Sequence, residues 1–432
     1  CPSIHFKKLY NGLSFSIYKK NFAFLSHNSK DLRKSRENDP VYLKHTVSEL
    51  GKPILVKYDL DKLSKEISRD DIENSKIPGM WRYYPLLPVE LEKNRVSLGE
   101  TITPLVNFPR LAASIDSNGE RVFVKDESRL PTGSFKARGL SLAVSMAKEL
   151  GIKHLAIPTN GNAGSALAAY ASRAGIKATV LCPDNTPEIN VREAQIQGAN
   201  TFLVDGLIGE CGEIISNGNS ILDWFAVSTL KEPYRIEGKK TMGLELAEQL
   251  GWDLPDVIFY PTGGGTGIIG MWKGFLEMKE LGWIDCKLPK MVAVQSTGCA
   301  PIVKAWNEGK NYADFWDNAE TISSGIRVPS ALGDFLILDA IKSSKGFAIS
   351  VTDEETIDMQ KELGEKDGLL LCPEGAATLV AYKNSLRTGL VSVDDRVVLF
   401  NTATGLKYPL PNVDSSIKKD DIDYAVFKTK SV

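Results

Sequence analysis

The chain has 432 residues, of which 43% are hydrophobic and 25% charged, and its formal net charge is −2. This length exceeds a single ordinary core and predicts two domains with an additional segment. The balanced charge and the lack of a strongly basic stretch argue against a nucleic-acid partner and favour a small-molecule ligand. No apolar run reaches membrane-spanning length, and the start of the chain does not resemble a signal peptide, so we expect no membrane association.

The cysteines and histidines restrict the chemistry further. No Cys-x-x-Cys pair occurs, so the cysteines of this long chain are interpreted as free thiols of a reducing compartment, which predicts a cytoplasmic protein: Cys1, Cys182, Cys211, Cys286, Cys299 and Cys372. The last of the four histidines is His154. A Ser-His-Asp or zinc hydrolase is therefore not expected in the downstream region.

The pattern of the chain changes along its length. Residues 1–95 are rich in Lys, Asp, Asn and aromatic residues, with weak periodicity. From about residue 120 onward, apolar strands alternate with helices, which predicts an α/β fold with parallel-rich sheets covered by helices. The expected strands are residues 121–125, 154–158, 178–182, 201–204, 257–260, 291–295, 347–351 and 396–400, and the main expected helices are residues 163–174, 187–197, 241–250, 267–280 and 354–363. Ligands of such sheets bind at the carboxyl ends of the strands.

The most informative segment is residues 131–139, where Lys136 stands among small residues just before an apolar helical run. A lysine that forms an imine must be held in place and must lose its proton near neutral pH, and this setting suits both needs. Gly133 and Gly139 would allow a planar ring to approach, and Phe135 could pack beside it. Alone, the segment fits a surface lysine at a helix start equally well.

A second motif, residues 159–165, follows an expected strand and opens an Ala-rich helix. The free N–H groups of a helix N-terminus bind anions, which suits the α-carboxylate of an amino acid. Asn162 could donate to a phenolate oxygen of a cofactor. Ordinary helix capping by Asn or Ser is the alternative.

A third motif joins an expected strand to a helix through Gly263, Gly264, Gly265, Thr266 and Gly267. Consecutive glycines present backbone N–H groups to a phosphate, and the threonine adds a hydroxyl. Gly265-x-Gly267-x-x-Gly270 also matches a dinucleotide fingerprint, which would make the protein a nicotinamide-dependent oxidoreductase. That fingerprint requires an acidic residue at the end of the next strand, and residues 291–295 end in Gln, so we favour a monophosphate site.

A fourth motif, residues 401–407, also follows an expected strand. The Thr402 hydroxyl could face a pyridine nitrogen, although an ordinary turn of small polar residues explains the segment as well. Together, the four motifs place a lysine, an amide, a phosphate site and a hydroxyl at strand ends.

The order of these motifs and the residues in them resemble those of the fold-type II pyridoxal-phosphate enzymes, the tryptophan synthase β family, over about residues 50–411. Within this family, residues 234–238 (Tyr-Arg-Ile-Glu-Gly) are similar to the threonine synthases, with support from residues 79–83, 228–241 and 325–329. The resemblance implies pyridoxal 5'-phosphate as cofactor and Lys136 as the catalytic, imine-forming lysine. It implies that the cofactor is bound by Phe135, Lys136, Asn162, Gly263, Gly264, Gly265, Thr266, Gly267 and Thr402, with Thr404 in place of Thr402 if the loop register differs.

The resemblance also implies the reaction, in which O-phospho-L-homoserine and water give L-threonine and phosphate, and a homodimeric enzyme. Asn160, Gly161 and Ala163 would bind the substrate carboxylate, and Lys231 and Arg235 its phosphate, because a guanidinium fork matches phosphate oxygens. A surface charge pair with Glu232 or Glu237 is the alternative for those two cations. A serine or threonine dehydratase is the alternative function, since it needs no second phosphate site, and a non-catalytic relative is a further one.

We expect a large cofactor-binding domain from residues 96–148 and 236–411, a smaller mobile α/β domain from residues 149–235, an N-terminal extension over residues 1–95 and a C-terminal tail over residues 412–432. Many relatives carry N-terminal cysteines that resemble a zinc ribbon, but Val47 and Leu50 stand where a Cys-x-x-Cys would lie. We therefore expect no metal. Ala137 likewise replaces an Asp that is common after the imine lysine.

Overall fold

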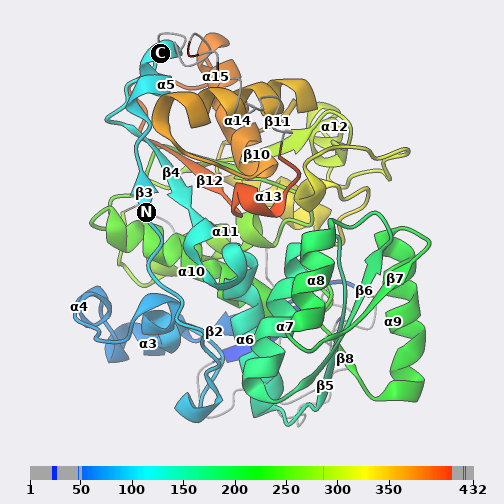
Figure 1. Cartoon of the computed structure of the whole chain (residues 1–432). Helices are drawn as coiled ribbons and strands as arrows, with labels where there is room; N and C mark the ends of the chain where they lie inside the picture. Colours follow the sequence, from blue (N-terminus) through cyan, green and yellow to red (C-terminus); the bar gives the residue numbers. More distant parts are fainter. Residues whose placement is uncertain are drawn as a thin grey trace.

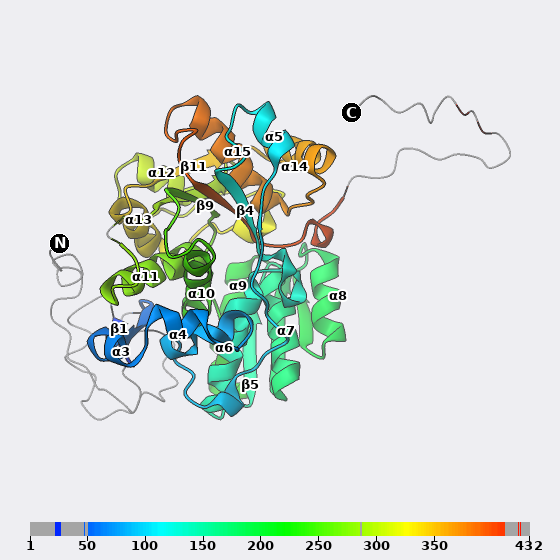
Figure 2. The ribbon, with the colours of Figure 1, turned by 90° about the vertical axis from the view of Figure 1, so that its left-hand side faces the viewer.

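The computed structural model describes residues 22–26, 47, 51–285, 287–410, 422 and 424 of the chain. Two separate sheets dominate these residues, and helices lie on both faces of each (Figure 1). The view turned by 90° separates the same two bodies, with α10 and α11 between them (Figure 2). The expected α/β class is confirmed.

The larger sheet has six strands in the order β11-β10-β9-β12-β4-β3. All neighbouring strands are parallel except β3 and β4, which are antiparallel. The bounds are β3 (Leu105–Val106), β4 (Val122–Asp126), β9 (Val257–Pro261), β10 (Lys290–Ser296), β11 (Phe347–Val351) and β12 (Val397–Asn401). Every residue of β9 and β12 is buried, as expected for central strands covered on both faces.

The smaller sheet has four parallel strands in the order β7-β6-β5-β8. Its strands are β5 (His154–Pro158), β6 (Lys177–Pro183), β7 (Asn200–Val204) and β8 (Phe225–Ala226). A separate antiparallel pair joins β1 (Phe22–Ser26) to β2 (Ile54–Tyr58). The eight expected strands are all present, within one or two residues of their predicted ends.

The first part of the chain also forms short helices: α3 (Leu60–Glu66), α4 (Arg69–Glu73), η1 (Gly79–Leu86) and η2 (Glu92–Asn94). Trp81 and Tyr83 of η1 are buried, so this stretch packs these two aromatic residues into the core. The remaining helices are α5 (Pro109–Ser114), η3 (Glu127–Arg129), η4 (Pro131–Gly133), α6 (Lys136–Glu149), α7 (Asn162–Ala174), α8 (Glu188–Ile196), α9 (Ile208–Leu222), α10 (Tyr234–Gln249), α11 (Thr266–Glu280), α12 (Pro301–Asn307), η5 (Ser324–Ile326), α13 (Asp334–Ser343), α14 (Asp353–Asp367), α15 (Pro373–Arg387) and η6 (Gly405–Lys407).

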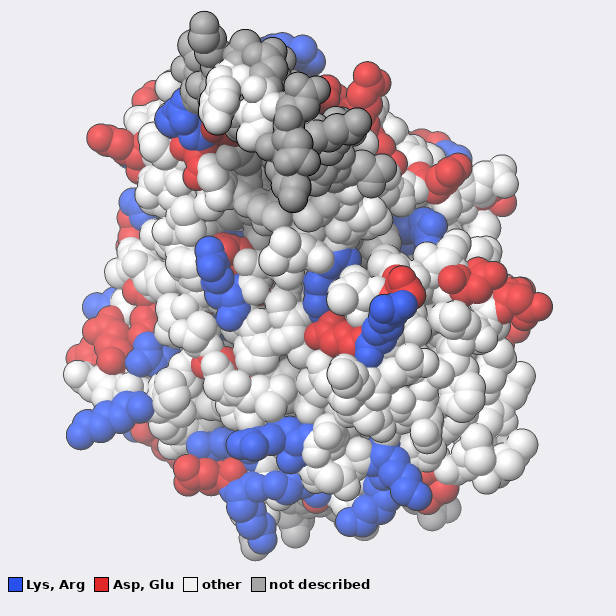
Figure 3. Space-filling model, viewed as in Figure 1, with Lys and Arg blue, Asp and Glu red and all other residues white. Residues whose placement is uncertain are grey.

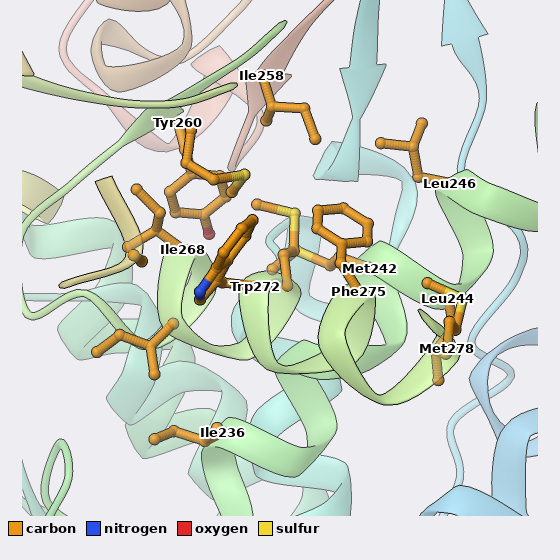
Figure 4. Packing of buried hydrophobic residues seen from close by; sticks show 14 of the residues in the cluster. Ile236, Met242, Leu244, Leu246, Ile258, Tyr260, Ile268, Trp272, Phe275 and Met278 are labelled. Atoms are coloured by element: carbon orange, nitrogen blue, oxygen red, sulfur yellow. The ribbon is translucent and has the colours of Figure 1, made fainter. Parts of the chain in front are cut away.

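The predicted start of one helix is wrong, and its burial explains why. The helix predicted over residues 241–250 begins at Tyr234, because residues 234–247 are all buried and their charged members hide the amphipathic pattern. This buried helix packs closely on α11, and Figure 4 shows Met242 of α10 beside Phe275 of α11. A glycine permits the approach, since a Cβ at Gly243 would lie 3.1 Å from Phe275 Cε1.

The division into domains stays a prediction. The apolar residues of α6 belong to the same buried cluster as those of β5, α7 and β6, although we expected α6 to belong to the larger domain. The segment proposed as a lost zinc ribbon lies mostly outside the described residues, as does the predicted tail over residues 412–432, of which only 422 and 424 are described. Cys1 and Cys286 also lie outside the described residues. The four cysteines that the structure describes are buried free thiols.

The surface carries both signs of charge. Lys and Arg side chains gather near the lower edge of the face in Figure 3, with Asp and Glu among them and along both sides. Within the described ranges, no three His, Cys, Asp or Glu side chains are arranged to hold a metal ion. None of the described helices is both long enough and apolar enough to span a bilayer.

Candidate active site

A cavity of about 310 Å³ lies where the carboxyl ends of β5, β9 and β12 face the first turns of α6, α7 and α11. It brings together nearly all the predicted site residues: Phe135, Lys136, Asn160, Gly161, Asn162, Ala163, Lys231, Arg235, Gly263, Gly264, Gly265, Thr266, Gly267 and Thr402. Thr404 does not line it. Motifs separated by more than 200 residues therefore form one site, as strand ends of parallel sheets should.

Lys136 is the first residue of α6, directly after a strained turn. Thr132 and Gly133 in that turn have φ of 60° and 62°. The turn is tied to the end of β12, because the Phe135 N–H donates to the Thr402 carbonyl at 2.9 Å. Burial and the positive charge of Arg235 lower the pKa of Lys136 to about 7, against an opposing effect of Glu374. Much of this amine is therefore uncharged at neutral pH, as a nucleophile or base must be.

The start of α7 forms a second wall. Gly161 precedes the helix with φ of 146°, and the Thr159 hydroxyl accepts from the N–H groups of Gly161 and Gly164 at 3.0 and 3.3 Å. The remaining N–H groups of the first turn are available to an anion in the cavity. The Asn162 amide donates to the Tyr408 hydroxyl at 3.4 Å, while its Oδ1 is buried without a partner among the described residues.

The glycine segment between β9 and α11 is required by packing. A Cβ at Gly264 would lie 2.8 Å from Thr229 Cγ2, one at Gly265 2.4 Å from Ile337 Cδ1, and one at Gly267 2.0 Å from the Tyr260 hydroxyl. Gly265 also has φ of 80°. The backbone can present its N–H groups to a ligand only because these positions carry no side chain.

The two threonines of the loop after β12 have different surroundings. Thr402 lies in the cavity, with its hydroxyl 3.7 Å from the buried Cys372 thiol. The Thr404 hydroxyl instead accepts from the Leu406 N–H at 3.3 Å and caps η6. The geometry thus favours Thr402 over Thr404 as the hydroxyl that faces a cofactor, and this role stays a prediction.

Arg235 is buried, so the surface-pair interpretation does not hold for it. Its Nη1 donates to the Val227 carbonyl at 2.8 Å, and its Nε has no hydrogen-bond partner in the part of the chain that the structure describes. The nearby Glu232 carboxylate accepts from backbone N–H groups at the start of α10, at 2.7 and 3.0 Å, rather than from the guanidinium. A buried guanidinium with spare donors is arranged to receive an anion.

Some lining residues were missed from the sequence: Ser228, Thr229, Tyr260, Glu374 and Tyr408. Glu374 stands in the first turn of α15, where acidic residues are common, so nothing in the sequence marked it. Its Oε1 accepts from the Gly325 N–H at 2.6 Å. Gly325 opens one of the stretches that resembled threonine synthases, which is the signal that could have directed attention to its partner.

The cavity fits pyridoxal phosphate. Several buried polar atoms around it lack a partner among the described residues, namely Asn162 Oδ1, Ser228 Oγ, Arg235 Nε and the Tyr260 hydroxyl. Buried polar atoms are normally satisfied, so these indicate a bound polar ligand. The glycine segment would hold its phosphate, Lys136 its aldehyde carbon, and Thr402 its ring nitrogen.

Comparisons with known proteins agree. Residues 96–403 match the family described as pyridoxal-phosphate dependent enzyme. Threonine synthase from Methanocaldococcus jannaschii is 34% identical over 362 residues, covering 84% of this chain and 88% of that protein. Threonine synthase from Methanosarcina acetivorans is 36% identical over 360 residues, covering 83% of this chain and 85% of that protein.

Comparison with solved structures finds the same fold at lower sequence identity. A structure of threonine deaminase isoform 2 from Solanum lycopersicum superposes with a TM-score of 0.60 at 19% identity, covering 80% of this chain and 85% of that one. This likeness shows a shared fold alone. The sequence relatives and the family match together show that the chain belongs to the pyridoxal-phosphate dependent enzymes and, within them, to the threonine synthase family.

Proposed function

We propose that the protein converts O-phospho-L-homoserine and water to L-threonine and phosphate. The observation that carries this proposal is the buried guanidinium of Arg235, which lines the same cavity as Lys136 and whose Nε has no hydrogen-bond partner among the described residues. The glycine segment suits the cofactor phosphate, while Arg235, with Lys231 and Ser228 beside it in the lining, offers separate donors for a substrate phosphate.

The bound cofactor supplies an electron sink for the charge that develops at the substrate Cα. The N–H groups at the start of α7 hold the substrate carboxylate and thereby fix the Cα–H bond in front of Lys136. With a pKa of about 7, the Lys136 amine can take that proton and return it.

The other end of the substrate lies against Arg235. A second proton leaves Cβ as the bond between Cγ and the phosphate oxygen breaks, and the charge of Arg235 stabilises the departing phosphate. Cγ then takes up a proton, which completes the methyl group. Water adds at Cβ and gives its proton to the released phosphate. No histidine is needed for this step, which agrees with the absence of histidine after His154.

The deciding experiment combines two measurements on the purified protein. Visible absorbance that disappears on borohydride reduction, with a mass tag on Lys136, would establish the cofactor linkage, and phosphate release from O-phospho-L-homoserine would establish the reaction. The cofactor signature without phosphate release, but with 2-oxo acid from L-threonine, would favour the dehydratase. No visible band after addition of pyridoxal phosphate would contradict both.

We further propose a cytoplasmic homodimer in which residues 149–235 move as a smaller domain. Light scattering tests the dimer, since it should give twice the 47.4 kDa of the chain. Small-angle scattering with and without a substrate analogue tests the motion, because closure of the cavity would reduce the radius of gyration.

A further inference from the structure

Helix α10 carries two adjacent lysines, Lys239 and Lys240, and both are fully buried. Lys240 Nζ forms ion pairs with Glu237 at 2.7 Å and Glu277 at 2.8 Å. No described carboxylate lies within ion-pair distance of Lys239, whose Nζ donates instead to the backbone carbonyl of Phe135. A buried ammonium without a counter-ion is very unfavourable, so the two neighbours must serve different purposes.

Glycines of two neighbouring helices leave room for the Lys239 side chain. A Cβ at Gly139 of α6 would lie 3.1 Å from its Cε and 3.3 Å from its Nζ. A Cβ at Gly270 of α11 would lie 2.9 Å from its Cβ. Two helices therefore carry glycine where α10 and this side chain approach them. A larger residue at either position would press on Lys239 and on the α10 backbone, since a Cβ would lie 3.0 Å from the Arg235 carbonyl oxygen at Gly139 and 2.9 Å from the Ile236 carbonyl oxygen at Gly270.

The Lys239 amine contacts the peptide bond between Phe135 and Lys136, the catalytic lysine. The Phe135 N–H is fixed by Thr402, and the Phe135 carbonyl by Lys239, so both sides of this residue are held. Both amines lie close to the Phe135 ring, with Lys239 Nζ 4.0 Å and Lys136 Nζ 4.8 Å from its centroid.

The surroundings disfavour a charge on Lys239. Burial and the cations Lys136, Arg235 and Arg138 hold its pKa well below its usual range, and only Glu127 opposes them. That carboxylate is already engaged by Arg138 at 2.6 Å. These surroundings favour the uncharged amine, which can still donate a hydrogen bond.

We propose that Lys239 is a positioning residue, which donates a hydrogen bond to the Phe135 carbonyl and so fixes the backbone from which Lys136 projects. The inference deepens the proposed function, because it takes Lys136 as the catalytic lysine. It concerns a residue that the comparison with the family did not single out.

The test measures the pKa of Lys136 in cofactor-free protein, from the pH dependence of its labelling by acetic anhydride, read by peptide mass spectrometry. Lys239→Met leaves the Phe135 carbonyl without a donor, so the peptide can move and water can enter. We expect the Lys136 pKa to rise by about one unit or more and kcat to fall about tenfold, with little change in KM. Lys239→Gln keeps a neutral donor and should restore both values to nearly those of the unaltered protein.

Control variants distinguish the positioning role of Lys239 from a general effect on the stability of the protein. Lys240→Gln removes the paired neighbour, so it should lower the melting temperature and leave the Lys136 pKa unchanged. If Lys239→Met does not fold, Gly139→Ala displaces the Lys239 end and should shift the Lys136 pKa in the same direction. The proposal is overturned if Lys239→Met leaves the Lys136 pKa and kcat unchanged, or if Gly139→Ala does so where Lys239→Met does not fold. It is also overturned if Lys239→Gln behaves like Lys239→Met. Failure of the proposed reaction would leave the labelling result intact, so the two failures are distinguishable.

Discussion

Two groups of buried charges include residues of α10, and they differ in how the charges are balanced. In the first, which we call the paired cluster, Lys125, Glu127, Arg138 and Glu245 satisfy one another, with ion pairs of 2.6 to 2.9 Å. In the second, the cationic cluster, no described carboxylate forms an ion pair with Lys136, Arg235 or Lys239. Lys136, the proposed catalytic amine, and Arg235 of the cationic cluster line the cavity, whereas no residue of the paired cluster does.

The pKa values reflect the same contrast. Burial alone would raise the pKa of Glu245, but Arg138 and Lys125 lower it to about 2. Burial and Arg235 instead lower the pKa of Lys136 to about 7. Charges that stabilise a fold are thus paired within the protein, and charges that serve a ligand are left for the ligand to satisfy.

The strongest way to test the cationic cluster is Lys136→Ala. Loss of the amine that carries the cofactor and moves the Cα proton should lower kcat by about 10⁴-fold or more. The fold should persist, because the substitution removes an unpaired amine rather than an ion pair. Steady-state phosphate release measures the first effect, and circular dichroism on heating measures the second. Activity like that of the unaltered protein would contradict the assignment of Lys136.

The paired cluster should respond in the opposite way. Glu245→Gln leaves Lys125 and Arg138 without their shared partner, so the free energy of unfolding at pH 7 should fall by about 3–5 kcal/mol. A carboxyl with a lowered pKa contributes its stability above pH 4.5 and loses it as the pH falls toward 2, so the difference should shrink over that range. Urea unfolding at several pH values measures it. A loss below about 1 kcal/mol at pH 7 would argue against a structural role.

The sequence predicted the cavity better than it predicted these clusters. Strand ends and glycine motifs are local patterns, so the positions of Lys136, Asn162 and Gly263 could be inferred from the order of residues alone. The partners of buried charges come from distant segments, such as Lys125 with Glu245, and no local pattern reports them. For the same reason, the sequence did not predict the early start of α10 or the position of Glu374 in the cavity lining.

Arg235→Ala tests whether the unpaired guanidinium receives the substrate phosphate. A charge-assisted contact of this kind is worth about 2–3 kcal/mol, so KM for O-phospho-L-homoserine should rise about 100-fold. Stability should fall less than in Glu245→Gln, since Arg235 forms no ion pair with a described carboxylate, although the Val227 carbonyl loses its donor. A KM that stays the same would move the proposal toward the dehydratase, whose substrate carries no phosphate.

The smallest expected effect concerns proton uptake by Lys136 itself. Only the neutral amine can react with pyridoxal phosphate, so the rate at which the visible band forms in cofactor-free protein should fall about tenfold for each pH unit below about 7. Arg235→Met removes the positive charge that helps to lower this pKa, and burial remains. The midpoint should therefore move to higher pH, which makes the variant slower than the unaltered protein at pH 7 and equal to it at high pH. Stopped-flow absorbance measures both curves, and Glu245→Gln is the matched control because its charge belongs to the other cluster. If the midpoint is the same in all three proteins, the cations of the cavity do not tune the catalytic amine, and burial alone accounts for its reactivity.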